Sequence, residues 1–96
     1  MTPLHYAMRG KNAEAAIALL EAGADPNIPN RDNIRPISMI GGMPERLDVL
    51  QLMLNKGANV DNIINKDQSI LKSYKPSKYF PDSSIYDLMK KYSKIK

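Results

Sequence analysis

A chain of 96 residues, of which 43% are hydrophobic and 25% charged, is long enough for one small globular domain and lacks the composition of a disordered segment. It contains no cysteine, which excludes disulfides, thiolate catalysis and the usual structural zinc sites. No apolar run approaches the roughly 20 residues of a membrane span, and Pro3, His5 and Arg9 interrupt any signal-peptide core. The net charge of +4 is unevenly placed, because residues 1–62 sum to −1 (six Lys or Arg against seven Asp or Glu) and residues 63–96 sum to +5 (eight Lys against three Asp).

The first two predicted helices span residues 3–10 and 13–22. Thr2 followed by Pro3 is a favourable helix start, because a hydroxyl caps the first turn and proline loses no hydrogen bond at the first helical position. Gly23 follows the second helix, where the chain must turn through positive φ.

Two further helix pairs are predicted at residues 36–41 and 45–56, and at residues 70–75 and 84–92. Gly57 follows the fourth helix as Gly23 follows the second. Helices this short are marginal alone and need their neighbours. We therefore expect one extended core, shared by Leu4, Ile17, Leu20, Ile37, Leu50, Met53, Leu54, Leu71 and Leu88.

The sequence also repeats itself. Gly-Ala-Asp-Pro-Asn at 23–27 returns in altered form as Gly-Ala-Asn-Val-Asp at 57–61, with the two glycines 34 residues apart. Thr-Pro-Leu-His-Tyr-Ala at 2–7 has weaker counterparts at 35–40 and 69–74. A fixed period of this length is typical of repeat architectures.

Residues 2–27 resemble an ankyrin repeat, whose signature is T-P-L-H-x-A followed by a second helix ending in L-L-x-x-G-A-D-x-N. The segment 35–67 keeps part of the pattern and lacks its Thr and His. The segment 69–96 is recognisable mainly by position. The family's hairpin tips normally carry Gly, and Asn33 and Asp67 stand there instead, both of types that tolerate the left-handed region.

The resemblance implies an all-α fold, an ankyrin-repeat solenoid of paired antiparallel helices with short hairpin loops and about three repeats. The first would be residues 1–34, lacking its preceding hairpin arm, and the second residues 35–68. Residues 69–96 would form a degenerate third repeat that acts as a C-terminal cap with a frayed basic tail. No segment alternates apolar and polar residues as a half-buried strand should, and no seven-residue repeat indicates a coiled coil.

The two ends of the predicted stack differ. Lys90 stands where earlier repeats have Leu20 and Leu54, and burying an unpaired ammonium is unfavourable, so this side is expected to face water. A polar outer face is what the terminal repeat of a solenoid requires.

At the other end, no hairpin arm precedes Thr2, so Leu4, Ala7 and Ile17 are expected to be partly exposed. Such a face predicts self-association through the uncapped N-terminal side. We interpret the chain as the C-terminal piece of a longer array. A complete small protein with an open first repeat is the alternative.

His5 is the one histidine, and the resemblance implies that it is structural, hydrogen-bonding within and between repeats together with the Thr2 hydroxyl. There is no second His and no Cys for a metal cluster. Gly41-Gly42 lacks the surroundings of a phosphate-binding loop. The methionines are expected to fill the core, except for partial exposure at Met39 and Met43. We expect no enzyme activity, cofactor, metal or small-molecule substrate.

The resemblance implies a protein-binding module that holds its partner on a concave surface of hairpin tips and first helices. Ile34 and Met39 would be apolar anchors, and Arg31, Asp32 and Lys66 would set charge complementarity. The exposed positions that the family varies are here Tyr6, Arg9, Arg31, Asp32, Ile34, Met39, Asn65, Lys66, Gln68 and Ser73.

Other functions stay open. The chain could be a structural C-terminal cap of a larger ankyrin-repeat protein whose binding or enzymatic function lies upstream. Nucleic-acid or acidic-membrane contact by the Lys-rich C-terminal third is a weaker hypothesis, for which a solvated cap face is the preferred interpretation. We expect a cytoplasmic protein and leave open an effector delivered into a host cell.

Overall fold

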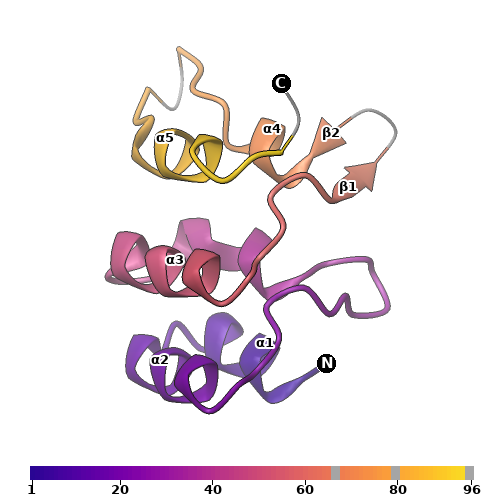
Figure 1. The fold of residues 1–96 in the computed structure, drawn as a ribbon, viewed down its shortest axis with the longest axis vertical. Helices are drawn as coiled ribbons and strands as arrows, with labels where there is room; N and C mark the ends of the chain where they lie inside the picture. Colours follow the sequence, from indigo (N-terminus) through magenta and orange to yellow (C-terminus); the bar gives the residue numbers. More distant parts are fainter. Residues whose placement is uncertain (66–67, 79–80, 95–96) are drawn as a thin grey trace.

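The computed structural model describes residues 1–65, 68–78 and 81–94, and it shows three layers of paired helices stacked along the longest axis (Figure 1). The second helix of each pair lies toward the viewer, and the first helix lies behind it. The elements, in chain order, are α1 (Pro3–Arg9), α2 (Ala13–Glu21), the 3-10 helix η1 (Pro36–Gly42), α3 (Arg46–Asn55), β1 (Ile63–Asn65), β2 (Gln68–Ser69), α4 (Ile70–Ser73) and α5 (Ser84–Lys90).

Each predicted helix is present, with its ends displaced by at most two residues, because the capping signals in the sequence act as expected. The Thr2 hydroxyl accepts a hydrogen bond from the His5 N–H (3.3 Å) at the start of α1. Ser69 caps α4 in the same way, since its Oγ accepts from the Lys72 N–H (3.2 Å).

The turns also take the predicted backbone conformations. Gly23 (φ 99°) and Gly57 (φ 91°) follow α2 and α3 with positive φ, as expected for residues just beyond a helix. Asn33 has φ 61°, which confirms that it replaces the hairpin-tip glycine without changing the backbone. The matching prediction for Asp67 lies outside the described residues.

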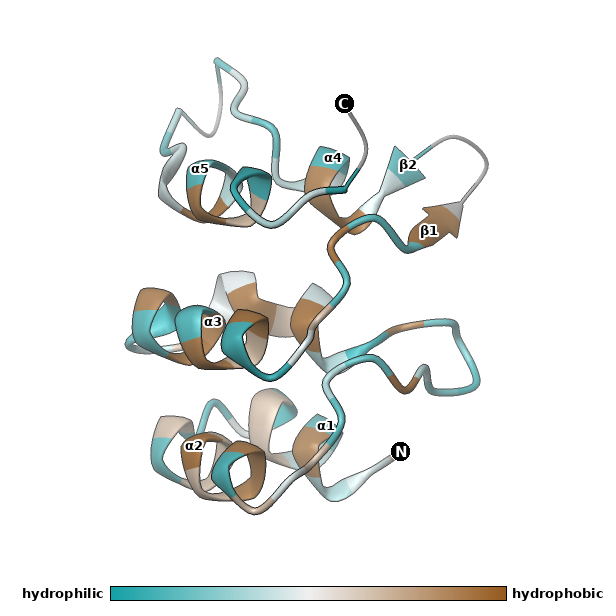
Figure 2. Ribbon diagram, viewed as in Figure 1, coloured by the Kyte–Doolittle hydropathy of each residue, from teal (hydrophilic) through white to brown (hydrophobic). Residues whose placement is uncertain are grey.

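The core runs through all three layers as one cluster. Leu4, Leu20, Ile37, Leu50, Met53 and Leu54 are buried as predicted, while Ile17, Leu71 and Leu88 are only half-buried. The brown segments in Figure 2 mark apolar residues in every layer. Met89 is buried, as expected for the methionines, and a further group of buried side chains was not predicted, namely Ile40, Val49, Val60 and Ile70.

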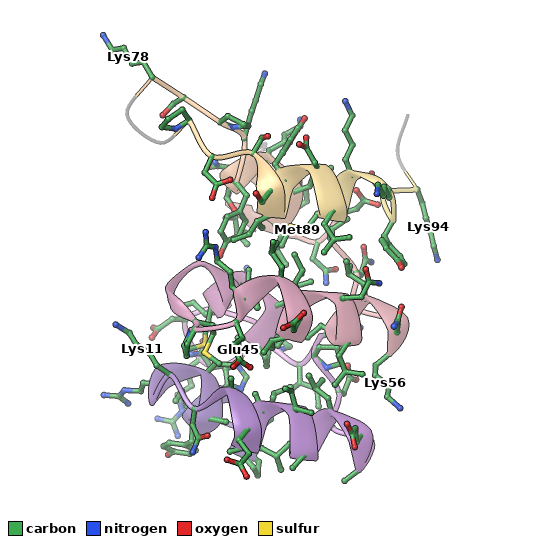
Figure 3. All side chains as sticks on the ribbon, turned by 90° about the vertical axis from the view of Figure 1, so that its left-hand side faces the viewer. Lys11, Glu45, Lys56, Lys78, Met89 and Lys94 are labelled. Atoms are coloured by element: carbon green, nitrogen blue, oxygen red, sulfur yellow. The ribbon has the colours of Figure 1, made fainter. Side chains whose placement is uncertain are left out.

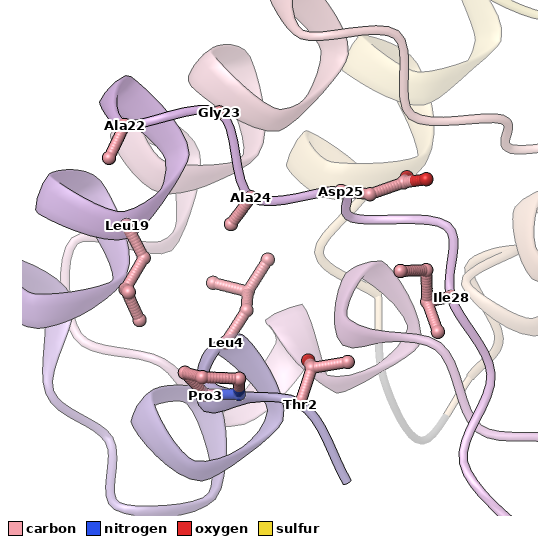
Figure 4. Close-up of a pocket in the computed structure, with 9 residues that line it drawn as sticks. All are labelled: Thr2, Pro3, Leu4, Leu19, Ala22, Gly23, Ala24, Asp25 and Ile28. Carbon is pink, nitrogen blue, oxygen red and sulfur yellow. The ribbon is translucent and has the colours of Figure 1, made fainter.

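The expected exposure of Leu4 and Ala7 was wrong. Leu4 is 1% exposed and Ala7 8%, whereas Ile17 is half-buried as predicted. The reason is local, because α2 and the turn after it cover this side of α1. Figure 4 shows Leu4 pointing into the space between Leu19 and Ala24.

The all-α expectation was wrong in one place. Ile63 pairs with Ser69, and Asn65 with Gln68, in a short antiparallel hairpin with an irregular register. Strands of three and two residues are too short for an alternating pattern, so this pairing leaves no signature in the sequence.

The first helix of the second layer also differs from expectation, because residues 36–42 form a 3-10 helix. Tyr74 of the third layer reaches this helix, where its hydroxyl donates to the Ser38 carbonyl (2.7 Å) and accepts from the Gly41 N–H (3.1 Å). Met43, expected to be partly exposed, is 3% exposed, because it closes the end of this helix against the core.

Candidate functional site

Two loops project from the same side of the stack, on the right of Figure 1. One is the segment 28–35 between the first two layers, and the other is the β1–β2 hairpin before the third. We call the exposed residues of these two loops, together with those of α1, η1 and α4, the hairpin-side surface. This is the surface on which the sequence analysis placed the predicted partner-binding residues.

Buried His5 holds the first loop in place. Its Nε2 lies 2.8 Å from the Ile34 carbonyl oxygen, and its Nδ1 lies 3.1 Å from the Thr2 backbone nitrogen and 2.8 Å from the Thr2 hydroxyl. A carbonyl only accepts and a backbone N–H only donates, so the proton is on Nε2 and the lone pair on Nδ1. The ring is completely buried, and the structural role implied by the resemblance is confirmed.

The loop is further fixed by Asn30. Its N–H donates to the Ile34 carbonyl (2.9 Å), and its side-chain Oδ1 accepts from the N–H groups of Asp32 (2.9 Å) and Ile34 (3.0 Å). Several backbone N–H groups of the loop are thus satisfied within it. The side chains of Arg31, Asp32 and Ile34 remain exposed on a fixed backbone.

The first loop also contacts the second. The Asn33 side-chain amide lies 3.4 Å from the Ile63 carbonyl oxygen and 3.5 Å from that of Ile64, in a position to donate to both. Gln68 is exposed on β2, where it pairs with Asn65. The structure therefore brings the two loops into contact through Asn33 and leaves Gln68 exposed on the second of them.

The remaining predicted partner-binding residues differ in how exposed they are. Tyr6 (62% exposed) and Arg9 stand on α1, and Met39 is only half-buried on η1. Ser73 is exposed, but its hydroxyl donates to the Ile70 carbonyl (2.6 Å) within its own helix. Asn65 lies in β1, its side chain is outside the description, and Lys66 lies outside the described residues.

Two apolar residues of this side were missed from the sequence. Ile28 is 44% exposed and Ile63 is 51% exposed, comparable with the 39% of Ile34. Both stand in the predicted hairpin arms, and Figure 2 shows β1 in brown. The signal in the sequence that could have identified them is that both isoleucines fall outside every predicted helix.

Chemistry of other kinds finds no support in this part of the chain. No cluster of three or more His, Cys, Asp or Glu that could hold a metal ion occurs within the described residues. Over the same residues, none of the helices has the length and apolar character needed to cross a membrane.

In a comparison with known families, residues 1–31 match the family model of the ankyrin repeat. Comparison with curated proteins and with solved structures found no match. Ankyrin repeats are generally protein–protein interaction modules and are typically not enzymes. The matched segment contains α1, α2, the contacts of His5 with Thr2 and the turn at Gly23, so the first third of this chain is similar to an ankyrin repeat over both of its helices.

Proposed function

We propose that the whole chain is a solenoid of about three ankyrin-type repeats, residues 1–34, 35–68 and 69–96, which binds another protein through the hairpin-side surface. Hydrogen bonds that recur at the same spacing support the repeat count. Asp25 Oδ1 accepts from the Asn27 N–H (2.8 Å), and 34 positions later Asn59 Oδ1 accepts from the Asp61 N–H (2.9 Å).

The links between layers recur too. Asn27 accepts from the Asn59 N–H (2.7 Å) and donates to the Gly57 carbonyl (2.9 Å), which ties the first layer to the turn after α3. Asp61 stands 34 residues beyond Asn27 and accepts from the Ser93 hydroxyl (2.6 Å) and the Lys94 N–H (2.8 Å) after α5. Equivalent positions therefore make equivalent links, as stacked repeats require.

The observation that carries the binding surface is the exposure of Tyr6 and Ile34 on backbone that buried His5 fixes. Large apolar side chains on a preorganised backbone are effective binding anchors, since little conformational freedom is lost when a partner covers them. The charged neighbours Arg31 and Asp32 would select the partner and its orientation.

A photo-crosslinking amino acid in place of Ile34 tests this proposal in lysate of the source cells. The matched control is the same amino acid in place of Leu47, which is equally exposed at 42% but lies on α3, away from the projecting loops (Figure 1). We expect a crosslinked protein at position 34 that is absent at position 47.

The crosslinked protein is then purified, and its affinity is measured against substituted chains. We expect Ile34→Ser and Tyr6→Ser each to weaken binding by about tenfold, which corresponds to about 1.4 kcal/mol, and Leu47→Ser to leave the affinity unchanged. An affinity that is insensitive to both substitutions would exclude the hairpin-side surface.

A second candidate function is that of a C-terminal cap in a larger ankyrin-repeat protein. It is supported by α5, which buries Met89 toward α3 and leaves Asp87, Lys90 and Lys91 exposed (Figure 3). The exposure of Lys90 confirms the sequence-based expectation for that residue. A cap contributes stability rather than binding, so here Tyr6 and Ile34 substitutions in the full-length protein would leave partner affinity unchanged.

Self-association through the first layer would be a further mode of contact. A shallow hollow of about 410 Å³ lies on that side, bordered by Pro3, Leu19, Ala22 and Ile28 (Figure 4). Sedimentation of the wild type and of Leu19→Glu tests it, because a dimer held by this side would dissociate in the variant. A wild-type chain that stays monomeric would exclude the contact.

A further inference from the structure

A second hollow, of about 570 Å³, lies on the third layer between the β1–β2 hairpin, α4 and α5. Its size is within the range of about 300–1,000 Å³ that is usual for ligand sites in proteins. The residues that border it include Ile63, Leu71, Lys72, Tyr86 and Lys90. None of them belongs to the first loop, while Ile63 and Lys72 are also part of the hairpin-side surface.

The hollow combines apolar walls with cations. Ile63 is 51% exposed, and Leu71 and Tyr86 are half-buried, so apolar surface remains open to a ligand. Lys72 and Lys90 are exposed at its border. The Lys90 Nζ lies 5.8 Å from the centre of the Tyr86 ring, within the distance at which a cation and a ring attract each other.

Neither cation forms an ion pair with a described carboxylate, although Asp61 keeps its negative charge at the border of the hollow. Asp61, which also borders the hollow, accepts hydrogen bonds from the Ser93 hydroxyl and the Lys94 N–H. Asp82 forms an ion pair with Arg46 (3.0 Å), and Asp87 accepts from the Ser83 hydroxyl (2.8 Å).

Over the part of the chain that the structure describes, Lys72 and Lys90 have no carboxylate within ion-pair distance. The surrounding segment, residues 63–96, carries a net charge of +5. A ligand that approaches the hollow therefore meets positive potential and two cations available for pairing.

We propose that this hollow binds an acidic segment of a partner protein, in which an apolar side chain is flanked by Asp or Glu. The apolar side chain would rest against Leu71, Ile63 and Tyr86, and the carboxylates would pair with Lys72 and Lys90. A concave apolar site with two cations at its border fits such a segment better than a duplex phosphate backbone or a flat lipid surface, since both of those engage many cations on an extended face. The site extends beyond the hairpin-side surface, which it shares at Ile63 and Lys72, and it does not require Tyr6 or Ile34 to bind anything.

The test is fluorescence anisotropy of the complete chain with a labelled peptide in which two leucines are flanked by glutamates. The double variant Lys72→Glu/Lys90→Glu should weaken binding by about tenfold or more, because two attractive contacts become repulsive. The control Lys11→Glu/Lys56→Glu changes the net charge equally on the first two layers (Figure 3) and should leave the affinity within about twofold. Circular dichroism checks that both variants are folded.

Two further measurements separate a built site from general charge attraction. A peptide with serine in place of both leucines should bind at least about tenfold more weakly, because the apolar contact is lost. In NMR titration, the amide signals of Leu71, Lys72 and Lys90 should shift, and those of Tyr6 and Ile34 should not.

The proposal is overturned by any of several results. These are no binding of the leucine peptide, equal loss of affinity in both charge variants, equal affinity for the serine peptide, or shifts confined to Tyr6 and Ile34. Tighter binding to duplex DNA or to phosphatidylserine vesicles than to the peptide would also overturn it, since the site would then recognise phosphate.

Discussion

The junction between the first two layers and the junction between the last two use the same sequence positions with different side chains. At the first junction, the side-chain amide of Asn27 can both accept and donate, so it pairs with the Asn59 N–H and the Gly57 carbonyl. Asp61 serves the second and only accepts, so it pairs with the Ser93 hydroxyl and the Lys94 N–H. The same sequence position makes the link at both junctions, and the type of side chain at that position determines which groups it binds.

The two junctions differ more on the side of the first helices. His5 ties α1 to the first loop through Nε2 and to Thr2 through Nδ1, whereas the side chain of Ser38, at the corresponding place in η1, accepts from the Arg35 N–H (3.3 Å). Tyr74 of the third layer then supplies hydrogen bonds to η1. The second layer, which has Ser38 where the first has His5, is thus supported by a side chain from the third layer.

The largest loss of stability is expected from a substitution in the core that the layers share. Leu54→Ala should lower the free energy of unfolding by about 2–5 kcal/mol, because the side chain is 4% exposed and its removal leaves a cavity. Lys90→Ala, on the exposed side of α5, should change it far less. Chemical denaturation measures both, and equal losses would show that the inner and outer sides of the stack are wrongly assigned.

His5 and Ser38 allow a direct comparison of the two first helices. His5→Ala should destabilise the chain by about 1–3 kcal/mol, since the Ile34 carbonyl and the Thr2 N–H lose the hydrogen-bond partners that the completely buried ring provides. Ser38→Ala removes one hydrogen bond and should have a smaller effect, about 0.5–1.5 kcal/mol. If the order were reversed in denaturation experiments, Ser38 rather than His5 would be the stronger tie.

Tyr74 should make the second junction sensitive to alkali. Burial raises the pKa of its hydroxyl above the usual 10.0, against a smaller opposite effect of the Gly41 N–H. The folded state therefore favours the neutral phenol, and this contribution is complete below pH 10 and is lost as pH rises through the folded-state pKa.

Tyr74→Phe isolates this contribution. At neutral pH it should destabilise the chain by about 1 kcal/mol, and the difference from wild type should shrink as pH rises above about 10. Urea titrations at several pH values measure it. A difference that stays constant across this range would contradict the role assigned to the buried hydroxyl.

The smallest effect is expected at Asp82, which joins the start of α3 to the start of α5 at the surface. Hydrogen bonds from the Ser84 hydroxyl and N–H, together with Arg46, lower its pKa from 3.8 to about 2. Its stabilising contribution is therefore present above the ordinary pKa and is lost as pH falls through about 2. Asp82→Asn should lower the melting temperature slightly at neutral pH, and the difference should vanish at strongly acid pH.

Local signals made much of the fold predictable from sequence. Thr2 acts through its hydroxyl on the next turn, and Gly23, Gly57 and Asn33 act through their own backbone, so their residue types indicated helix starts and turns correctly. The role of His5 followed from the ankyrin resemblance. The candidate binding surface was less predictable from the sequence, because the exposure of Tyr6 and Ile34 can be recognised only once the loop around His5 is in place.

What could not be predicted depends on contacts between distant residues. The Tyr74 hydroxyl reaches a carbonyl 36 positions away, and no spacing rule in the sequence indicates that pairing. Leu4 is buried by its own second helix and the following turn, rather than by a preceding repeat. The hollow beside Lys72 and Lys90 forms from three separate elements, so only their arrangement in space brings its apolar and cationic residues together.

Native-state hydrogen exchange of the wild type and of Asp61→Ala tests most directly whether the third layer docks on the second as the second docks on the first. The α5 amides should open before those of α1 and α2, and Asp61→Ala should speed their exchange about tenfold while leaving the first layer nearly unchanged, because repeats separate at their junctions. If α5 exchanged only with global unfolding, and Asp61→Ala affected all layers equally, the account of two equivalent junctions would be contradicted.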